Sequence, residues 1–425
     1  MKKRIASLLL ALTLLCSVFS LSSCYLMQLN SSSGSQSNTN SENKNNGGST
    51  INLNGGDSYN VSINSSASSD VLAASKALLS SVSVYCTFER VQYGGYYGTG
   101  STTTASSAGA GVIYKIDKTT GDAYVITNYH VVYDAYAKTT NHISDDINIY
   151  LYGMESADYA IPATYVGGSM HYDLAILKVS GSSVLMESSA MAVSFADSNK
   201  IAVLETAIAI GNPERKGISA TVGHINVDSE YITLNMSDSY TSTTVQLRVM
   251  RIDAAVNSGN SGGGLFNSKG ELIGIVNAKL SSDSVDSIGY AIPSNVVLAV
   301  ANNVIDYCEG TDKECVYRCI LGINVTAAKQ SAEYDKETGK IIKKESVAVS
   351  DITESSAVRE ILEIGDIINS ITIDGEKHEV FRIYHVIDVM LNARVGDTVV
   401  FNITHGGETK DVSIEITSSM LVAYK

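Results

Sequence analysis

Residues 257–276 read Asn-Ser-Gly-Asn-Ser-Gly-Gly-Gly-Leu-Phe-Asn-Ser-Lys-Gly-Glu-Leu-Ile-Gly-Ile-Val, a glycine-rich loop followed by two short apolar segments around a turn. Apolar segments of similar length recur between residues 81 and 291, separated by Gly, Asn, Asp and Ser; examples are residues 111–116, 123–127, 174–179 and 206–211. This spacing predicts strands joined by turns, and therefore a barrel or a pair of barrels.

The composition of the whole chain also favours β structure. Its 425 residues include 34 Gly and 24 Tyr but no Trp and only 3 Pro. One helix is expected at residues 294–307, where Val recurs at helical spacing and Ser294 is the expected N-cap. The net charge of −14 argues against nucleic acid as a partner, because no basic stripe is available to bind phosphates.

The first residues have the pattern of a secretory signal. Three basic residues precede an apolar run over residues 5–21, and Leu21-Ser-Ser-Cys24 resembles the lipobox of bacterial lipoproteins. By that resemblance residues 1–23 are a lipoprotein signal peptide, and Cys24 carries the lipid that anchors the chain to a bacterial membrane. An uncleaved helical anchor is the alternative; either way, the remainder is expected outside the cytoplasm. Residues 24–70 are rich in Ser, Asn and Gly, as in a flexible tether.

The cysteines give a weaker signal. Four of the six lie beyond the signal and the lipidation position, at Cys86, Cys308, Cys315 and Cys319. An oxidising compartment permits disulfides, so free thiols or one disulfide are expected. A metal site is disfavoured, because three clustered cysteines without a nearby His fit zinc spacing poorly.

A serine among glycines, Ser261, has the surroundings that an exposed nucleophile needs. Glycines allow close approach to a substrate carbonyl, and adjacent backbone N–H groups can converge on an oxyanion. An ordinary glycine-rich turn is the alternative. His130 follows an apolar strand and Asp173 precedes one. A base and an acid at strand ends, in the chain order His, Asp, Ser, favour a hydrolytic triad.

The segment Gly259–Gly263 also matches the G-x-S-x-G motif of lipases and esterases. That fold requires a strand-to-helix turn at the nucleophile, with Asp and then His downstream. Here a hairpin follows Ser261, and both partners lie upstream. The order therefore favours a trypsin-like arrangement over an esterase.

At this point the sequence resembles the HtrA/Deg family of serine endoproteases. The stretches that carry the resemblance occur in family order, at residues 127–132, 173–178, 207–213, 253–263 and 288–293. The resemblance implies a mainly β fold: a trypsin-like double β-barrel protease domain at residues 71–308, followed by an α+β PDZ domain at residues 315–425. It implies no metal and no cofactor.

The resemblance also implies roles for individual residues. Ser261 would be the nucleophile, His130 the base and Asp173 the residue that orients the base, with the N–H groups of Gly259 and Ser261 forming the oxyanion hole. By the same resemblance, the floor of the specificity pocket would lie near Ala255 and its wall near Asn277 and Ala278. No carboxylate stands there, so small or medium aliphatic substrate residues are expected.

Two positions near the nucleophile bear on its control. Asn260 has no charge to offer a new N-terminal ammonium, so activation by propeptide cleavage is not expected. Gly264 stands where the family commonly has Pro, and this departure predicts a looser oxyanion loop.

Residues 317–425 alternate expected strands with a short helix at residues 357–362 and an apolar stripe over residues 380–391. In PDZ domains a peptide C-terminus adds as a strand, and backbone N–H groups bind its carboxylate. By the resemblance that loop is Ile320-Leu321-Gly322-Ile323, with Leu321, Gly322 and Ile323 as the peptide-binding residues. No chemistry is assigned to His378, His385 or His405.

The sequence thus predicts a lipid-anchored serine endopeptidase of the cell envelope. It would degrade unfolded or damaged proteins and be regulated by peptide C-termini at its PDZ domain, and the family resemblance suggests a homotrimer. The alternative is a catalytically idle PDZ-containing surface chaperone or peptide sensor.

Overall fold

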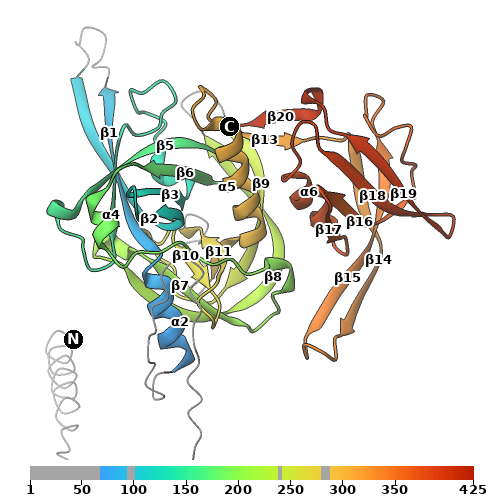
Figure 1. Ribbon diagram of the computed structural model, residues 1–425, viewed down its shortest axis with the longest axis horizontal. Coiled ribbons are helices and arrows are strands. Elements are labelled where there is room, and N and C mark those ends of the chain that lie inside the picture. The colour runs from blue at the N-terminus through green and yellow to red at the C-terminus, as the bar shows by residue number, and fades with distance from the viewer. Residues whose placement is uncertain (1–67, 93–100, 238–241, 279–287) are drawn as a thin grey trace, which may run out of the picture. The chain divides into compact units, whose positions relative to one another are not determined.

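The computed structural model describes residues 68–92, 101–237, 242–278 and 288–425 (Figure 1). The predicted signal peptide, Cys24 and almost all of the predicted tether lie outside these residues. Within the described ranges no helix combines the length and the apolar character needed to cross a membrane. The first described helix, α2 (Ser69–Leu78), begins two residues before the predicted start of the protease domain and is capped by the Ser68 hydroxyl.

The first barrel is built from six antiparallel strands and is closed. Its order is β1-β2-β3-β6-β5-β4. The strands are β1 (Ser81–Gln92), β2 (Ser101–Asp117), β3 (Asp122–Thr127), β4 (Asp146–Leu151), β5 (Ile161–Ser169) and β6 (Leu174–Val179). The short helix α3 (Tyr129–Val132) lies between β3 and β4, and the short helix α4 (Ser183–Glu187) follows β6. The ring closes where β4 pairs with β1, and the outer ends of β1 and β2 extend beyond the ring as a two-stranded hairpin.

The second barrel repeats this plan with another six strands, in the order β10-β11-β12-β9-β8-β7. They are β7 (Thr206–Gly211), β8 (Ser219–Ser237), β9 (Ser242–Ile252), β10 (Gly264–Phe266), β11 (Leu272–Val276) and β12 (Gly289–Pro293). The glycine-rich loop quoted above joins β9 to β10, so the prediction of paired barrels is confirmed.

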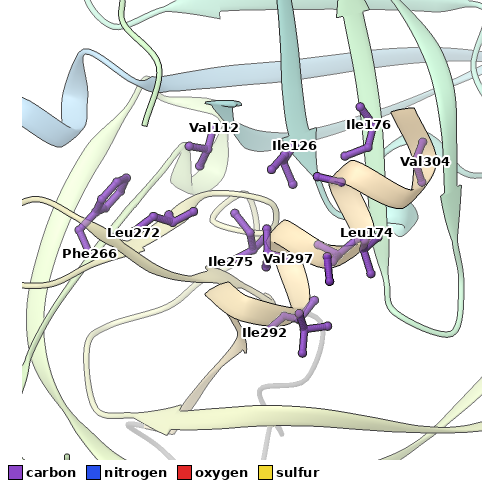
Figure 2. Packing of buried hydrophobic residues seen from close by; sticks show 14 of the residues in the cluster. Val112, Ile126, Leu174, Ile176, Phe266, Leu272, Ile275, Ile292, Val297 and Val304 are labelled. Atoms are coloured by element: carbon purple, nitrogen blue, oxygen red, sulfur yellow. The ribbon is translucent and has the colours of Figure 1, made fainter. Parts of the chain in front are cut away.

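The largest hydrophobic cluster takes side chains from both barrels and from helix α5 (Ser294–Cys308). Figure 2 shows Val297 and Val304 of this helix among Ile126, Leu174 and Ile275. All five are fully buried. Each such side chain stabilises the fold by roughly 1.5–3 kcal/mol, so α5 and both barrels stabilise one another.

The C-terminal region forms a separate sheet with its own core. The order is β14-β15-β16-β18-β19, with β17 paired to β16, and β14 lies at an edge. Its elements are β14 (Ile323–Tyr334), β15 (Ile341–Ile352), β16 (Ile367–Ile373), β17 (Glu376–Glu379), α6 (Ile383–Met390), β18 (Thr398–His405) and β19 (Glu408–Glu415). Two further strands, β13 (Val316–Cys319) and β20 (Leu421–Tyr424), pair with each other.

Two local predictions are wrong. Ser294 is not the N-cap of α5: Pro293 holds that position, and the Ser294 hydroxyl donates to Ala196 O at 2.6 Å. The expected helix at residues 357–362 is a series of turns. The Ile361 and Leu362 amides both donate to the Val358 carbonyl, one over three residues and one over four. The regular hydrogen-bond ladder of a helix does not form.

All four cysteines in the described residues are free and buried. Burial raises the pKa of the Cys86 thiol to about 12 and those of Cys308 and Cys319 to about 11. These thiols are therefore protonated and unreactive at neutral pH.

Candidate active site

The imidazole of His130 and the carboxylate of Asp173 form the centre of the candidate site. His130 lies in the one-turn helix α3, directly after β3, and Asp173 lies directly before β6. His130 Nδ1 is 2.7 Å from Asp173 Oδ2, and the His130 backbone N–H donates to Asp173 Oδ1 at 3.0 Å. Since a carboxylate accepts only, Nδ1 carries the proton, and Nε2 of the neutral ring is left to accept one.

Two asparagines complete the surroundings of Asp173. Asn277 Nδ2 donates to Asp173 Oδ2 at 2.7 Å, and Asn128 Nδ2 donates to the Asp173 backbone carbonyl at the same distance. Asp173 itself has a left-handed backbone with φ of 47°, a conformation that Asp and Asn tolerate best among residues with a side chain. The carboxylate is thus buried but held by three N–H donors, which replace the water that it loses.

Ser261 lies in a tight turn fixed to both barrels. Its carbonyl accepts from the Ala110 amide of β2 at 2.8 Å, and the Gly262 amide donates to Val276 O of β11 at 3.0 Å. Gly262 has φ of 83°, and a Cβ there would lie 2.3 Å from Thr127 Oγ1 and 2.9 Å from the Asn128 nitrogen. The turn therefore rests against the end of β3, where His130 follows.

The structure brings the three predicted triad residues to one place but does not form every bond between them. No hydrogen bond joins His130 Nε2 to Ser261 Oγ, although both residues are described. In free enzymes this bond is often long and tightens only when substrate is present.

The amides predicted to form the oxyanion hole are available as donors. Neither the Gly259 nor the Ser261 N–H donates to another described residue, whereas the carbonyls of both are occupied. Gly259 O accepts from the Asn212 amide at 3.1 Å and Ser261 O from Ala110. Two N–H groups on either side of Asn260, neither of them bonded to another described residue, can bind a developing negative charge.

The predicted specificity-pocket residues are less closely grouped. Ala255 is exposed, and its carbonyl accepts from Thr221 Oγ1 at 2.9 Å. Asn277 and Ala278 follow β11 directly and are buried, and the Asn277 side chain is turned toward Asp173. Residues 279–287, next in the sequence, lie outside the described part of the chain, so this pocket stays a prediction.

Gly264 has a different role from the one expected. It belongs to strand β10 and pairs with Ile275, so it lies in a strand and not in the loop that precedes it. A Cβ at this position would lie 2.4 Å from the Phe266 ring. Gly264 thus makes room for the buried Phe266 ring, and a side chain at this position would require that ring to move.

The loop predicted to bind a peptide carboxylate lies at the start of the edge strand β14. Gly322 has φ of 74°, and its carbonyl accepts from the Thr353 amide at 2.9 Å. Among the described residues, the Leu321 and Gly322 amides have no acceptor, and Ile323 begins β14. Free N–H groups beside an open strand edge suit capture of a peptide end.

The contact between Asn277 and the Asp173 carboxylate was not predicted from the sequence. One signal for this contact was available in the sequence: Asn277 is a polar residue directly after the apolar segment 272–276. That segment itself follows the glycine-rich loop. The contact of Asn128 was not predicted either, and its position two residues before His130 was the only available sign.

Comparisons with known proteins agree with this geometry. Residues 109–275 match the trypsin-like peptidase domain family, and residues 319–416 match the PDZ domain family. The chain is 34% identical over 299 residues to "Serine protease Do-like HtrA" of Lactococcus lactis subsp. cremoris, an alignment that covers 66% of each protein. It is 31% identical over 265 residues to "Periplasmic pH-dependent serine endoprotease DegQ" of Escherichia coli, covering 62% of this chain and 50% of DegQ.

The extent of these alignments differs between relatives. The chain spans just under two thirds of the Lactococcus lactis protein and half of DegQ. The "Serine protease Do-like HtrA" of Lactobacillus helveticus is 30% identical over 317 residues, and the alignment covers 73% of this chain and 68% of that protein. Both domains, in the same order and with this degree of identity, show that the chain belongs to the HtrA family of trypsin-like proteins with a C-terminal PDZ domain.

Proposed function

We propose that this protein is a serine endopeptidase in which Ser261 attacks the scissile carbonyl. His130 Nε2 takes the hydroxyl proton and then gives it to the leaving amine, which releases the first product and leaves an acyl-enzyme. Water, activated by the same nitrogen, then releases the acyl group. The observation that supports this most directly is the 2.7 Å contact between His130 Nδ1 and Asp173 Oδ2, which fixes the ring in the tautomer the reaction needs.

The amides of Gly259 and Ser261 stabilise the tetrahedral intermediate. Among the described residues they have no internal partner, and they lie in a loop fixed by backbone bonds, so little reorganisation is needed when charge develops. Loss of one such donor costs roughly 3–4 kcal/mol of barrier.

The substrates are unfolded or damaged proteins outside the cytoplasm, cleaved after small or medium aliphatic residues. Ala255, Asn277 and Ala278 offer no carboxylate to a basic side chain. The chain is exported by residues 1–23 and anchored to the membrane by lipid on Cys24. DegQ, to which it is similar, is named a periplasmic enzyme.

Peptide C-termini bind the PDZ domain at Leu321, Gly322 and Ile323 and regulate the protease. The two free amides there and the unpaired edge of β14 support this assignment. As in the family that it belongs to, the chain assembles as a homotrimer.

A fluorophosphonate probe tests the chemistry directly. We expect the purified fragment from residue 68 onward to degrade casein and to be labelled at Ser261, with more labelling when a hydrophobic C-terminal peptide is added. Ser261→Ala should abolish both. Peptide binding without labelling or casein cleavage would instead indicate an idle chaperone or sensor, and hydrolysis of short acyl esters without peptide cleavage would indicate an esterase.

A further inference from the structure

The loop between β7 and β8 has an unusual backbone. Glu214 and Arg215 are consecutive residues with φ of 56° and 60°, and neither is glycine. Side chains rarely adopt this left-handed conformation, because Cβ approaches the following carbonyl oxygen. Two such residues in succession persist only when surrounding contacts hold them.

This loop fixes the orientation of the peptide bond that supplies an oxyanion donor. The Glu214 amide donates to Ser258 O at 3.0 Å, and the next carbonyl, Gly259 O, accepts from Asn212. In a trans peptide the C=O and N–H groups point in opposite directions. With Ser258 O held toward Glu214, the Gly259 N–H must point away from the loop, and this leaves it free for an oxyanion.

Two side chains tie the strained loop to the other barrel: Asn212 Nδ2 donates to Tyr85 Oη of β1 at 2.9 Å, and the Arg215 guanidinium binds Ser106 of β2. Arg215 donates from Nη1 to Ser106 Oγ at 3.0 Å and from Nη2 to Ser106 O at 2.9 Å. Ser106 lies on β2, four residues before Ala110, whose amide holds the Ser261 carbonyl. The strand that positions one oxyanion donor therefore also anchors the loop that orients the other.

The guanidinium group is not a packing element of the core. Arg215 lines an open pocket of about 430 Å³ together with Ser106, Ser258 and Gly259. Removing its side chain enlarges a solvent-filled space and leaves no cavity in a barrel. The neighbouring pair of Glu214 and Lys216 is exposed and adds little, because water screens it.

We propose that Arg215 is a positioning residue for the oxyanion hole: its two bonds to Ser106 hold the Glu214 amide against Ser258 O and so keep the Gly259 N–H turned toward the reaction centre. This proposal rests on the proposed peptidase function. Without the clamp, the left-handed loop relaxes and the peptide bond between Ser258 and Gly259 is free to turn. Substrate still binds, but the developing charge loses a donor.

The test compares Arg215→Ala, Arg215→Lys and, as a matched control in the same loop, Lys216→Ala. For Arg215→Ala we expect kcat on a fluorogenic peptide to fall about 10- to 100-fold, somewhat less than loss of a whole donor, with KM changed less than threefold. Arg215→Lys should recover part of kcat, since it keeps one donor, and Lys216→Ala should match the wild type. A peptide aldehyde, which forms a hemiacetal with Ser261, should bind Arg215→Ala more weakly by the same factor as kcat falls.

Separate measurements distinguish this proposal from a loss of folding or of function. The thermal midpoint of Arg215→Ala should match that of the wild type, and in a Ser261→Ala background the Arg215→Ala change should leave substrate-peptide binding unaltered. An Arg215→Ala enzyme with wild-type kcat and aldehyde affinity overturns the clamp while leaving the peptidase function intact. A rise in KM with an unchanged kcat also overturns the clamp. A wild-type protein that neither cleaves peptides nor reacts at Ser261 overturns the proposed function and the clamp together.

Discussion

The two barrels hold their halves of the candidate site by different means. In the half that the first barrel supplies, side chains do most of the fixing: the His130 imidazole and the Asn277 side chain, which comes from the end of β11, both meet the buried Asp173 carboxylate, together with the His130 backbone amide. In the second barrel the functional groups near Ser261 are backbone amides, and backbone bonds from Ala110 and Asn212 orient them. The first half therefore depends on which side chains are present, and the second on which backbone conformations are allowed.

The difference predicts opposite sensitivities. An isosteric change of chemistry should damage the side-chain half and leave its backbone intact. Adding a single methyl group should damage the backbone half without removing any functional group. The predictions that follow test this contrast, beginning with the largest effect.

Asp173→Asn tests the side-chain half. Asn tolerates the left-handed backbone at this position, so the fold should survive, but its amide cannot hold His130 in the required tautomer. We expect kcat on a peptide substrate to fall about 10⁴-fold, with an unchanged circular dichroism spectrum. A loss smaller than tenfold would show that Asp173 does not orient the base.

Gly259→Ala tests the backbone half. Gly259 has φ of 97°, and a Cβ there would lie 2.1 Å from Asn212 O, so the peptide must move. We expect kcat to fall about 10²–10³-fold, as for loss of one oxyanion donor. Gly310→Ala is the matched control, since Gly310 has φ of 70° but open space around it. Equal effects of the two substitutions on activity would refute the steric explanation.

Asn277→Ala removes one of the donors to Asp173 and leaves the others in place. A hydrogen bond to a charged group contributes about 1.5–3 kcal/mol, so kcat should fall at least tenfold while KM is retained. Asn277→Ser keeps a donor and should recover part of the loss. If instead KM for aliphatic substrates rises and kcat is kept, Asn277 acts in the predicted specificity pocket.

A second histidine sharpens the comparison, because its surroundings are the opposite of those of His130. His385 of α6 is buried, and its pKa is lowered to about 3. Burial is the main cause, and repulsion from Arg248 and Arg382 adds to it. Aromatic rings of Phe381 and Tyr384 pack edge-on against it. The attraction of Asp197 is too weak to offset these effects, and the Phe381 backbone N–H donates to Nδ1 of the ring, so His385 is neutral in the folded protein near neutral pH.

This contrast predicts a pH-dependent stability. In the unfolded chain His385 is protonated below about pH 6.5, whereas in the folded chain it is protonated only near pH 3. The contribution of the neutral His385 to the free energy of unfolding is therefore fully present above pH 6.5 and declines as the pH falls. Between pH 7 and pH 5.5 the contribution is about 1 kcal/mol. Urea titrations should show that His385→Gln loses this part of the decline and that His224→Gln, at an exposed position, keeps it. Identical slopes for wild type and His385→Gln would contradict the assignment.

The fold and the three central residues could be read from the sequence for identifiable reasons. Strand-length apolar segments between turns predicted the barrels, and His130 and Asp173 stood out because each adjoins such a segment. Ser261 stood out because glycines surround it. These signals are local, and closure of the barrels brings the local pieces together.

The missing parts depend on tertiary contacts. The roles of Asn277 and Arg215 require β11 to end beside the start of β6 and the β7–β8 loop to reach β2, and neither follows from residue spacing. The prediction of Ser294 as the N-cap was wrong because the Ser294 hydroxyl donates to Ala196 O, almost a hundred residues away in the sequence. Residues 357–362 had helix-compatible side chains but too short a segment to sustain a helical ladder.

The buried thiols place natural reporters at separate points of the molecule. Cys86 lies in the core of the first barrel, Cys308 in the shared core with α5, and Cys319 in the core of the C-terminal sheet. In a fragment that begins at residue 68, a thiol-reactive dye would modify each position only when its own neighbourhood opens. The rate and order of modification would then map which region loosens first when a substrate or a regulatory peptide is added.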